Sequence, residues 1–165
     1  MAAIVQIFIS PGHNFFGHHG RAPGTHAIRE QETVACLAGR GLAGDRFLDH
    51  KDNYKGQVTF FAEETFEEIR QALDEFNRPV SAFRRNIVTR GLDLNELIGR
   101  QFLLDGVLFE GTEECRPCAW MDEAFAPGAE QWLRGRGGLR ARILTNGTLR
   151  RCADVNWEVL DAIHA

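Results

Sequence analysis

The segment RQFLLDGVLFEG, residues 100–111, constrains the fold most, because Asp105 and Gly106 separate two apolar runs. An Asp-Gly pair between apolar runs is a strong signal for a two-residue β-hairpin turn. The same pattern recurs around Asn146 and Gly147. Other short apolar segments bounded by turn residues are residues 3–10, 32–39 and 57–61. The sequence therefore predicts many short strands and two hairpins.

One long helix and a few short helical segments accompany these strands. In residues 62–76, Phe66, Ile69, Leu73 and Phe76 recur at helical spacing, which predicts an amphipathic helix with one buried face. Shorter helical segments are expected at residues 93–99 and 127–135, and the tail is expected to be a strand or a helix. This balance predicts a mainly β, β-rich α+β fold, namely a closed or nearly closed β-barrel with a few peripheral helices.

Length and composition are those of one globular domain. The 165 residues predict a single domain over residues 1–165, and 44% hydrophobic with 25% charged residues is ordinary for such a domain. No apolar run reaches the roughly 18 residues that a membrane-spanning helix needs. The N-terminal stretch MAAIVQIFIS lacks the basic region of a signal peptide. We therefore expect a cytoplasmic protein with no membrane partner.

The charge pattern argues against nucleic-acid partners and favours small anions. The net charge is −4 at pH 7, and the nineteen basic residues include only two lysines, Lys51 and Lys55. Several arginines cluster at residues 84–85, 134–142 and 150–151. Arginine presents a planar fork that suits phosphate and carboxylate groups. A base-composition bias explains the number of arginines equally well, but it does not explain their clustering.

Cys115 and Cys118 lie in the segment ECRPCAWMD, directly after the second strand of the first predicted hairpin. A thioredoxin-type redox pair would need a βαβ context. A zinc site would need a second matched pair of ligands, whereas Cys36 and Cys152 are isolated. Two packed, buried cysteines are the plain alternative. The adjacent Arg116 favours a nucleophilic or metal-binding thiolate.

Three other segments offer anion-binding groups, each with a purely structural alternative. In FRRNIVTRG, Arg84 and Asn86 can donate to an anion, or the segment is a solvated turn. In GLAGDR, the adjacent Asp45 and Arg46 can contribute to a binding site, or they form only a local ion pair in a turn. In GRGGLRAR, the glycines and Arg140 can cradle a phosphate, or form a flexible turn.

His13, His18 and His19 lie in a long loop rich in Gly and Pro. Histidine can ligate a metal or transfer protons near neutral pH. Because these histidines have no paired ligand spacing, we expect an exposed or substrate-gating loop rather than a metal site.

Taken in order, the motifs resemble the MOSC domain, named after the C-terminal domain of molybdenum-cofactor sulfurase. The resemblance covers most of the chain, from VQIFISPGH through GRGLAGDR, FRRNIVTRGLDLNELIGRQFLLDGVLFEG and CRPCAWMD to PGAEQWLRGRGGLRARILTNGTL. No single motif is decisive, but the ordered set is specific and is similar to the stand-alone bacterial type. The resemblance implies a barrel of the pyruvate-kinase-barrel-like type, which agrees with the strand pattern.

The resemblance also implies a molybdenum-cofactor (molybdopterin) site around Cys118, the expected catalytic residue. In amidoxime-reducing relatives the matching cysteine is a thiolate ligand of molybdenum, and in sulfurase-type relatives it was proposed to carry a persulfide. The segment FRRNI matches an Arg-x-Asn pattern that holds the cofactor, so Arg84 and Asn86 are expected to bind it. The other expected cofactor-binding residues are Asp45, Arg46 and Arg140.

Some positions depart from the family pattern. Arg85 stands where amidoxime-reducing relatives carry proline, and Arg116 and Pro117 replace their Ser-Arg pair. Direct cofactor contacts of these three residues are therefore not implied. Cys152, in RRCADV, takes the place of an expected Gly-Asp turn and is interpreted as a local substitution.

Domains that are fused to this one in relatives are missing from the sequence. Without an aminotransferase-like domain, the chain is expected to bind no pyridoxal phosphate itself. Electrons or sulfur would have to come from an electron-transfer or cysteine-desulfurase partner protein. Three functions follow: a component of a molybdenum-dependent reductase of N-hydroxylated small molecules, which we favour; a sulfur carrier that uses a Cys118 persulfide; or a non-catalytic ligand-binding domain with a packed cysteine.

Overall fold

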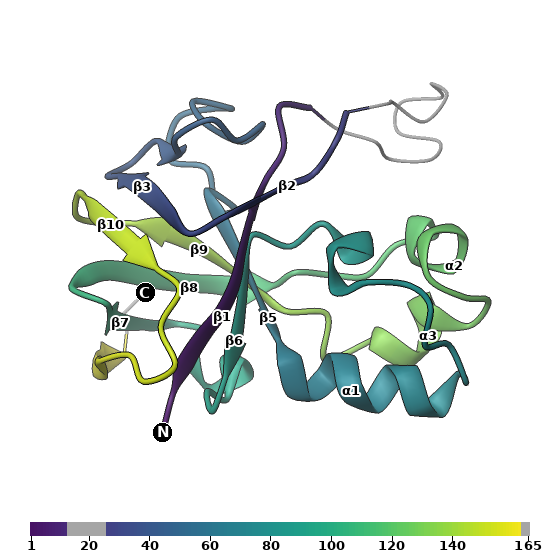
Figure 1. The fold of residues 1–165 in the computed structure, drawn as a ribbon. Helices are drawn as coiled ribbons and strands as arrows, with labels where there is room; N and C mark the ends of the chain where they lie inside the picture. Colours follow the sequence, from purple (N-terminus) through teal and green to yellow (C-terminus); the bar gives the residue numbers. More distant parts are fainter. Residues whose placement is uncertain (13–25, 163–165) are drawn as a thin grey trace.

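The strands of the computed structural model, which describes residues 1–12 and 26–162, form two sheets (Figure 1). The larger sheet has the order β11-β7-β8-β9-β5-β6-β1-β2, and the smaller has the order β10-β3-β4. The larger sheet contains β1 (Ala3–Ile9), β2 (Arg29–Gln31), β5 (Val58–Ala62), β6 (Ile87–Arg90), β7 (Arg100–Leu104), β8 (Val107–Glu114), β9 (Leu139–Ile143) and β11 (Trp157–Ala162). The smaller contains β3 (Thr33–Leu37), β4 (Gly41–Leu42) and β10 (Gly147–Arg150). The helical elements are α1 (Glu63–Ala72), α2 (Trp120–Ala124), α3 (Ala129–Leu133) and the 3₁₀ turns η2 (Val80–Phe83) and η3 (Leu94–Leu97).

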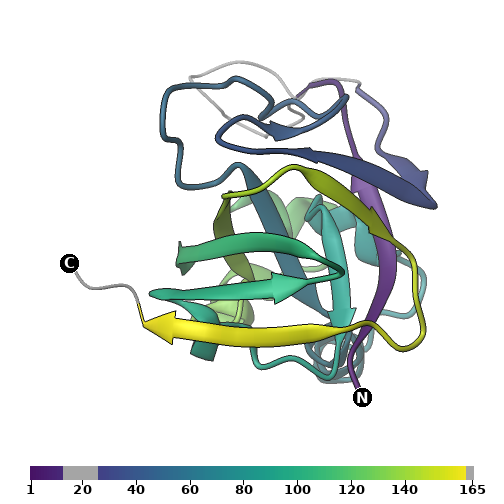
Figure 2. The same cartoon turned by 90° about the vertical axis from the view of Figure 1, so that its left-hand side faces the viewer.

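The larger sheet curls into a half-barrel that does not close (Figure 2). Its outermost strands are β11 and β2, which do not pair with each other. Ile4 and Cys152 exchange two main-chain hydrogen bonds of 3.0 Å, which tie the chain before β11 to strand β1. The predicted β-rich fold is confirmed, and the barrel is incomplete.

Two apolar clusters hold the layers together, one on each face of β5. Phe60 belongs to the cluster between the sheets, where its ring meets those of Phe102 and Phe109 edge to face, with centroids 5.8 and 5.3 Å away. Phe61 belongs to the cluster under the helices, where it packs against Phe83. Successive side chains of a strand point to opposite faces, which explains why the segment QVTFF is apolar without alternation. Figure 1 shows α1, α2 and α3 gathered on the same side of the sheet.

One predicted hairpin is confirmed and the other is wrong. Strands β7 and β8 pair across Asp105 and Gly106, whose φ angles of 51° and 80° suit a tight type I′ turn. Strand β10, however, pairs with β3 of the smaller sheet rather than with β9. The Asn146 side chain accepts a hydrogen bond from the Ala38 main-chain N–H at 2.7 Å. This long-range contact fastens the turn to β3, so the chain changes sheet where a hairpin was expected.

The long helix is confirmed but is shorter than predicted. It ends at Ala72, and Asp74 adopts a left-handed φ of 50°. Phe66 and Ile69 are buried as expected, whereas Phe76 lies beyond the helix and is 52% exposed. The expected place of Phe76 on the buried face is therefore wrong, because that face ends with the helix.

In the part of the chain that the structure describes, no helix has the length and apolar character needed to span a membrane.

Candidate functional site

Residues 84–86 link three parts of the fold. Arg84 ends η2 with a left-handed backbone, φ 57°, which is uncommon for a residue with a side chain. The chain turns there from η2 into β6, and three consecutive side chains leave in different directions. Arg84 reaches the segment after β1, Arg85 reaches the cysteine loop, and Asn86 points into the sheet.

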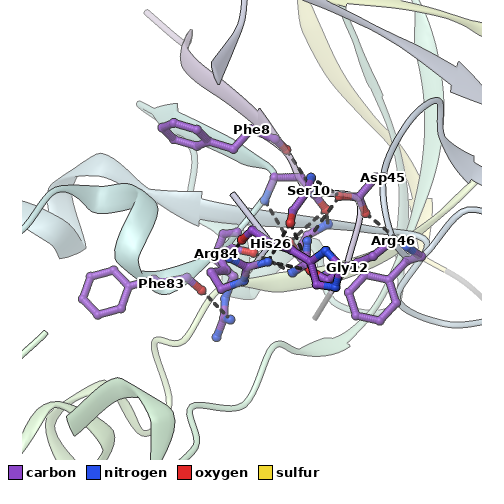
Figure 3. Close-up of polar contacts among 12 residues, drawn as sticks. Phe8, Ser10, Gly12, His26, Asp45, Arg46, Phe83 and Arg84 are labelled. Atoms are coloured by element: carbon purple, nitrogen blue, oxygen red, sulfur yellow. Dashed lines mark hydrogen bonds and ion pairs between the residues drawn. The ribbon is translucent and has the colours of Figure 1, made fainter. Parts of the chain in front are cut away.

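The guanidinium of Arg84 is buried against the end of β1 (Figure 3). Its Nη2 donates to the Ser10 hydroxyl and to the Gly12 carbonyl oxygen, both at 2.7 Å. Its Nη1 donates to the carbonyl oxygen of His26 at 3.4 Å. Arg84 is 6% exposed, and its buried Nε has no hydrogen-bond partner among the described residues.

Asp45 and Arg46 form a buried ion pair beside Arg84. Arg46 Nη1 lies 3.2 Å from an Asp45 carboxylate oxygen, and Asp45 also accepts from the main-chain N–H groups of Ser10 and Phe47. Arg46 Nη2 donates to the carbonyl oxygen of Arg84 at 3.0 Å. The Arg46 Nε is buried and, within the described residues, unpartnered. The expected local ion pair thus forms part of a larger cluster.

This cluster holds an excess of positive charge. Burial, and then the charge of Arg46, lower the pKa of the Arg84 guanidinium to about 10, against the effect of Asp45. Burial also lowers the pKa of Arg46, which Asp45 raises and Arg85 lowers again. The cluster thus places the guanidinium groups of Arg46, Arg84 and Arg85 near the single carboxylate of Asp45. Partly compensated buried cations favour the approach of an anion.

The Asn86 side chain forms its hydrogen bonds with neighbouring strands of the larger sheet. Its side-chain oxygen accepts hydrogen bonds from the Thr59 N–H at 3.0 Å and the Thr59 hydroxyl at 3.1 Å. Its Nδ2 donates to the Phe8 carbonyl oxygen at 3.1 Å. Asn86 is 1% exposed and joins β6 to β5 and β1. One N–H of its amide remains after these contacts, so its role in cofactor binding stays a prediction.

Arg140 lies at one side of the cluster, on β9. It donates to a carboxylate oxygen of Glu113 at 2.8 Å and to the hydroxyl of Tyr54. The Tyr54 ring stacks on Phe47 with a centroid separation of 5.6 Å, and the Arg46 guanidinium covers Phe47 at 4.8 Å. Arg140 is therefore connected to the buried arginines through two aromatic rings rather than directly.

The two cysteines of the CxxC segment differ in exposure. Cys115 is buried at 8% exposure, whereas Cys118 is exposed. The segment runs between β8 and the five-residue helix α2 without a hydrogen-bonded turn of its own. Both are free cysteines. Their difference in exposure favours one accessible thiol, Cys118, over a redox pair, and it removes simple packing as an account of Cys118.

The cysteine loop is fastened to residues 82–85 by contacts that the sequence did not reveal. Arg85 donates to the carbonyl oxygens of Cys115 at 3.1 Å and Gly137 at 2.9 Å, and Trp120 Nε1 donates to that of Ala82 at 3.4 Å. A Cβ atom on Gly137 would lie 2.3 Å from the Cys115 carbonyl oxygen. The glycines of GRGGLRAR therefore let two chain segments approach closely. The one sequence signal for the Arg85 contacts was that Arg85 stands where amidoxime-reducing relatives carry proline.

The structure thus brings together Asp45, Arg46, Arg84 and Asn86, with Arg140 at the side and the Cys118 loop attached through Arg85. No hydrogen bond or ion pair joins the Cys118 side chain directly to Arg84 or Asn86 among the described residues. His13, His18 and His19 lie outside the described residues. Within residues 1–12 and 26–162, no group of three or more His, Cys, Asp or Glu side chains is arranged to hold a metal ion.

Surface hollows of about 400 Å³ occur away from this cluster. One is lined by Glu64, Asp93 and Arg136, and another lies beside Arg151 and Cys152. None of the six expected site residues lines either hollow.

The fold and the site define a β-rich domain with a buried arginine pair and with an exposed thiol on a loop that Arg85 fastens to the segment of Arg84. The family model described as the MOSC domain matches residues 42–156, and the chain belongs to the MOSC domain family.

Solved structures share this fold at low sequence identity. The YUAD protein from Bacillus subtilis has a TM-score of 0.69 and 14% identity, over 92% of each chain. YiiM from Geobacillus stearothermophilus has a TM-score of 0.68 and 14% identity, over 98% of this chain and 76% of its own. YiiM from Escherichia coli has a TM-score of 0.66 and 16% identity, over all of this chain and 72% of its own. No protein with a curated functional description matches the sequence.

Proposed function

We propose that this domain binds a molybdopterin-type cofactor, with the Cys118 thiolate as a metal ligand. We further propose that it serves as a component of a molybdenum-dependent reductase of N-hydroxylated small molecules. The observation that carries the proposal is the attachment of an exposed thiol, Cys118, to the segment that holds the buried Arg46–Arg84 pair. We expect this protein in the cytoplasm, with electrons supplied by a partner protein.

The donor set fits the anionic end of such a cofactor. Arg46 and Arg84 each bury an Nε–H without a partner among the described residues, and a buried, unpaired donor is costly unless a ligand accepts from it. Phosphate, like carboxylate, accepts strong, charge-assisted hydrogen bonds from an arginine fork. Asp45 holds Arg46 in place, so these donors are oriented before a ligand arrives.

The thiol and the arginines would serve different ends of the cofactor. Cys118 offers a soft sulfur ligand, which suits a metal already bound by sulfur. Arg84 and Arg46 would hold the phosphate, and Asp45 would orient Arg46. When bound, the cofactor would supply the two-electron redox chemistry of the proposed reductase.

The test is the cofactor content of protein produced in cells that make the molybdenum cofactor. Molybdenum is measured by elemental mass spectrometry and pterin by the fluorescence of its oxidised product, in wild type, C118S and R84Q. The control variants are C152S, which removes a partly buried thiol outside the site, and R40Q, which removes an exposed arginine. We expect C118S to lose molybdenum, R84Q to lose pterin, and both controls to match wild type. Wild type with neither molybdenum nor pterin would contradict the proposal.

The exposure of Cys118 also favours a second function, sulfur transfer. The Cys118 thiolate would attack the outer sulfur of a persulfide on a cysteine-desulfurase partner. The partner's thiolate would leave, and Cys118 would hold the persulfide. Intact-mass spectrometry after incubation with a desulfurase and cysteine should then show one added sulfur atom in wild type and none in C118S. Equal addition to both proteins would exclude Cys118 as the carrier.

A further inference from the structure

The Arg85 side chain makes three hydrogen bonds to main-chain oxygens in three different places. Its Nε donates to Gly137 at 2.9 Å, its Nη2 to Cys115 at 3.1 Å and its Nη1 to Phe83 at 3.1 Å. Carbonyl oxygens at these distances are charge-assisted acceptors for a guanidinium. No carboxylate forms an ion pair with Arg85 in residues 1–12 and 26–162, so its contacts are with main chain.

The loop that Arg85 contacts has little regular structure to hold it. Residues 115–118 belong to no helix, strand or turn. The Cys115 N–H donates to the Gly138 carbonyl oxygen at 2.8 Å, and the Cys118 carbonyl oxygen accepts from the Met121 N–H at 2.9 Å. Arg85 adds the bond to the Cys115 carbonyl oxygen, at the point where the loop leaves β8.

Gly137 and the Cys115 carbonyl oxygen, which both accept hydrogen bonds from Arg85, lie very close together. Gly137, which accepts from Arg85, leaves no room for a Cβ, because such an atom would stand 2.3 Å from the Cys115 carbonyl oxygen. The Gly137 N–H in turn donates to the Glu114 carboxylate at 3.1 Å. Residues 137–138, the cysteine loop and the 83–86 segment therefore meet at one guanidinium.

We propose that Arg85 is the residue that positions Cys118, by fastening its loop to the segment that carries Arg84. Arg84 and Arg85 are adjacent, and their side chains point in different directions. The backbone of this one segment therefore positions both the buried Arg84 guanidinium and the Arg85 guanidinium that holds the start of the Cys118 loop. A lysine at position 85 would keep the charge but could not reach three oxygens with one planar fork. This role deepens the function proposed above, in that Cys118 is its working thiol, but it is tested without any cofactor.

The first experiment measures native-state alkylation of each cysteine in the apoprotein by peptide mass spectrometry. Wild type, R85Q and R85K are compared with R116Q, which removes a neighbouring exposed charge and leaves the three hydrogen bonds intact. Releasing the loop should expose Cys115, whereas Cys36 in the core reports global unfolding. We expect R85Q to raise the alkylation rate of Cys115 roughly ten-fold or more, with Cys36 still protected. R85K should give a smaller rise and R116Q none.

The second experiment reads the position of Cys118 itself. A nitroxide label is attached to Cys118 in a C115A/C152A background, and its electron paramagnetic resonance line shape reports local mobility. We expect a narrower line in R85Q, partial recovery in R85K and an unchanged line in R116Q. The proposal is overturned if R85Q leaves both the line and the Cys115 rate unchanged, if Cys36 becomes reactive in step with Cys115, or if R116Q reproduces R85Q.

R85K keeps the experiment decisive if R85Q does not fold. An R85K protein identical to wild type in both measurements would overturn the proposal, and a partial effect in both would support it. Failure of the cofactor proposal is a separate result, because it would appear as wild-type protein without molybdenum or pterin.

Discussion

Arg46 donates a hydrogen bond from its guanidinium to the main-chain carbonyl oxygen of Arg84 at 3.0 Å. The contact ties the loop after β4 to the turn before β6, which are far apart in the sequence. Arg84 has a left-handed backbone at this point, so the contact also supports an uncommon conformation. The buried arginine pair is therefore held by main chain on one side and by Asp45 on the other.

Asp45→Ala should destabilise the fold strongly. The Asp45 side chain is fully buried, and its loss would leave the Arg46 charge buried without its partner. Breaking such a pair costs about 3–5 kcal/mol of unfolding free energy. Urea unfolding followed by circular dichroism measures this cost. The control is Asp49→Asn, which removes the exposed charge paired with Arg40 and keeps a residue type that tolerates the positive φ of 54° at this position, so it should change stability little. Equal effects of the two variants would contradict the buried role of Asp45.

Asn86→Ala should lower stability by about 2–4 kcal/mol. The variant loses three side-chain hydrogen bonds and leaves the Thr59 N–H and the Phe8 carbonyl oxygen without this partner. Thr89→Val on the same strand is the control, because the buried Thr89 hydroxyl has no partner among the described residues. Removing that hydroxyl should be neutral or stabilising. If Asn86→Ala unfolds like wild type in urea, the hydrogen-bond assignment is wrong.

Gly137→Ala should displace the cysteine loop. The added methyl would clash with the Cys115 carbonyl oxygen, and the resulting shift should increase native-state alkylation of Cys115 several-fold. Gly135→Ala, two residues earlier in the chain, is the matched control, because a Cβ there meets no atom within 4 Å. Its positive φ of 83° still costs about 1 kcal/mol of stability. The two variants should therefore separate loop displacement from backbone strain, and an equal Cys115 rate in both would count against displacement.

Stability should fall at alkaline pH because of Cys36. Burial raises the pKa of this thiol to about 12 from its ordinary 9.0. Between these values the unfolded chain binds fewer protons than the folded chain, so the contribution is complete below about pH 9 and is lost as pH rises towards 12. Linkage predicts a loss of about 1 kcal/mol between pH 7 and pH 10.

Cys36→Ala isolates that contribution. The variant should be less stable at pH 7, because a buried side chain is truncated. Its unfolding free energy in urea should decline less than that of wild type between pH 7 and pH 10, by the amount given above. Parallel curves for the two proteins would show that Cys36 does not titrate as a buried thiol.

Local patterns predicted the fold where local forces decide it. Asp105 and Gly106 formed the expected turn because both residues tolerate a positive φ. Asn146 and Gly147 carried the same signal, yet Asn146 bonded to Ala38, more than a hundred residues away. Helix α1 ended before Phe76 although the spacing continued, because the chain turned at Asp74. Partner choice and element ends depend on contacts that no local window contains.

For the candidate site, too, some features follow from the sequence and others only from the tertiary structure. By itself the sequence determined the family, the β-rich class and the residue types that matter, because motif order and side-chain chemistry are local properties. Only the tertiary structure decided that Asn86 is occupied by Thr59 and Phe8, that Cys115 and Cys118 differ in exposure, and that Arg85 joins the thiol's loop to the arginine pair. Burial and hydrogen-bond partners arise from segments brought together by folding, and a linear pattern does not contain them.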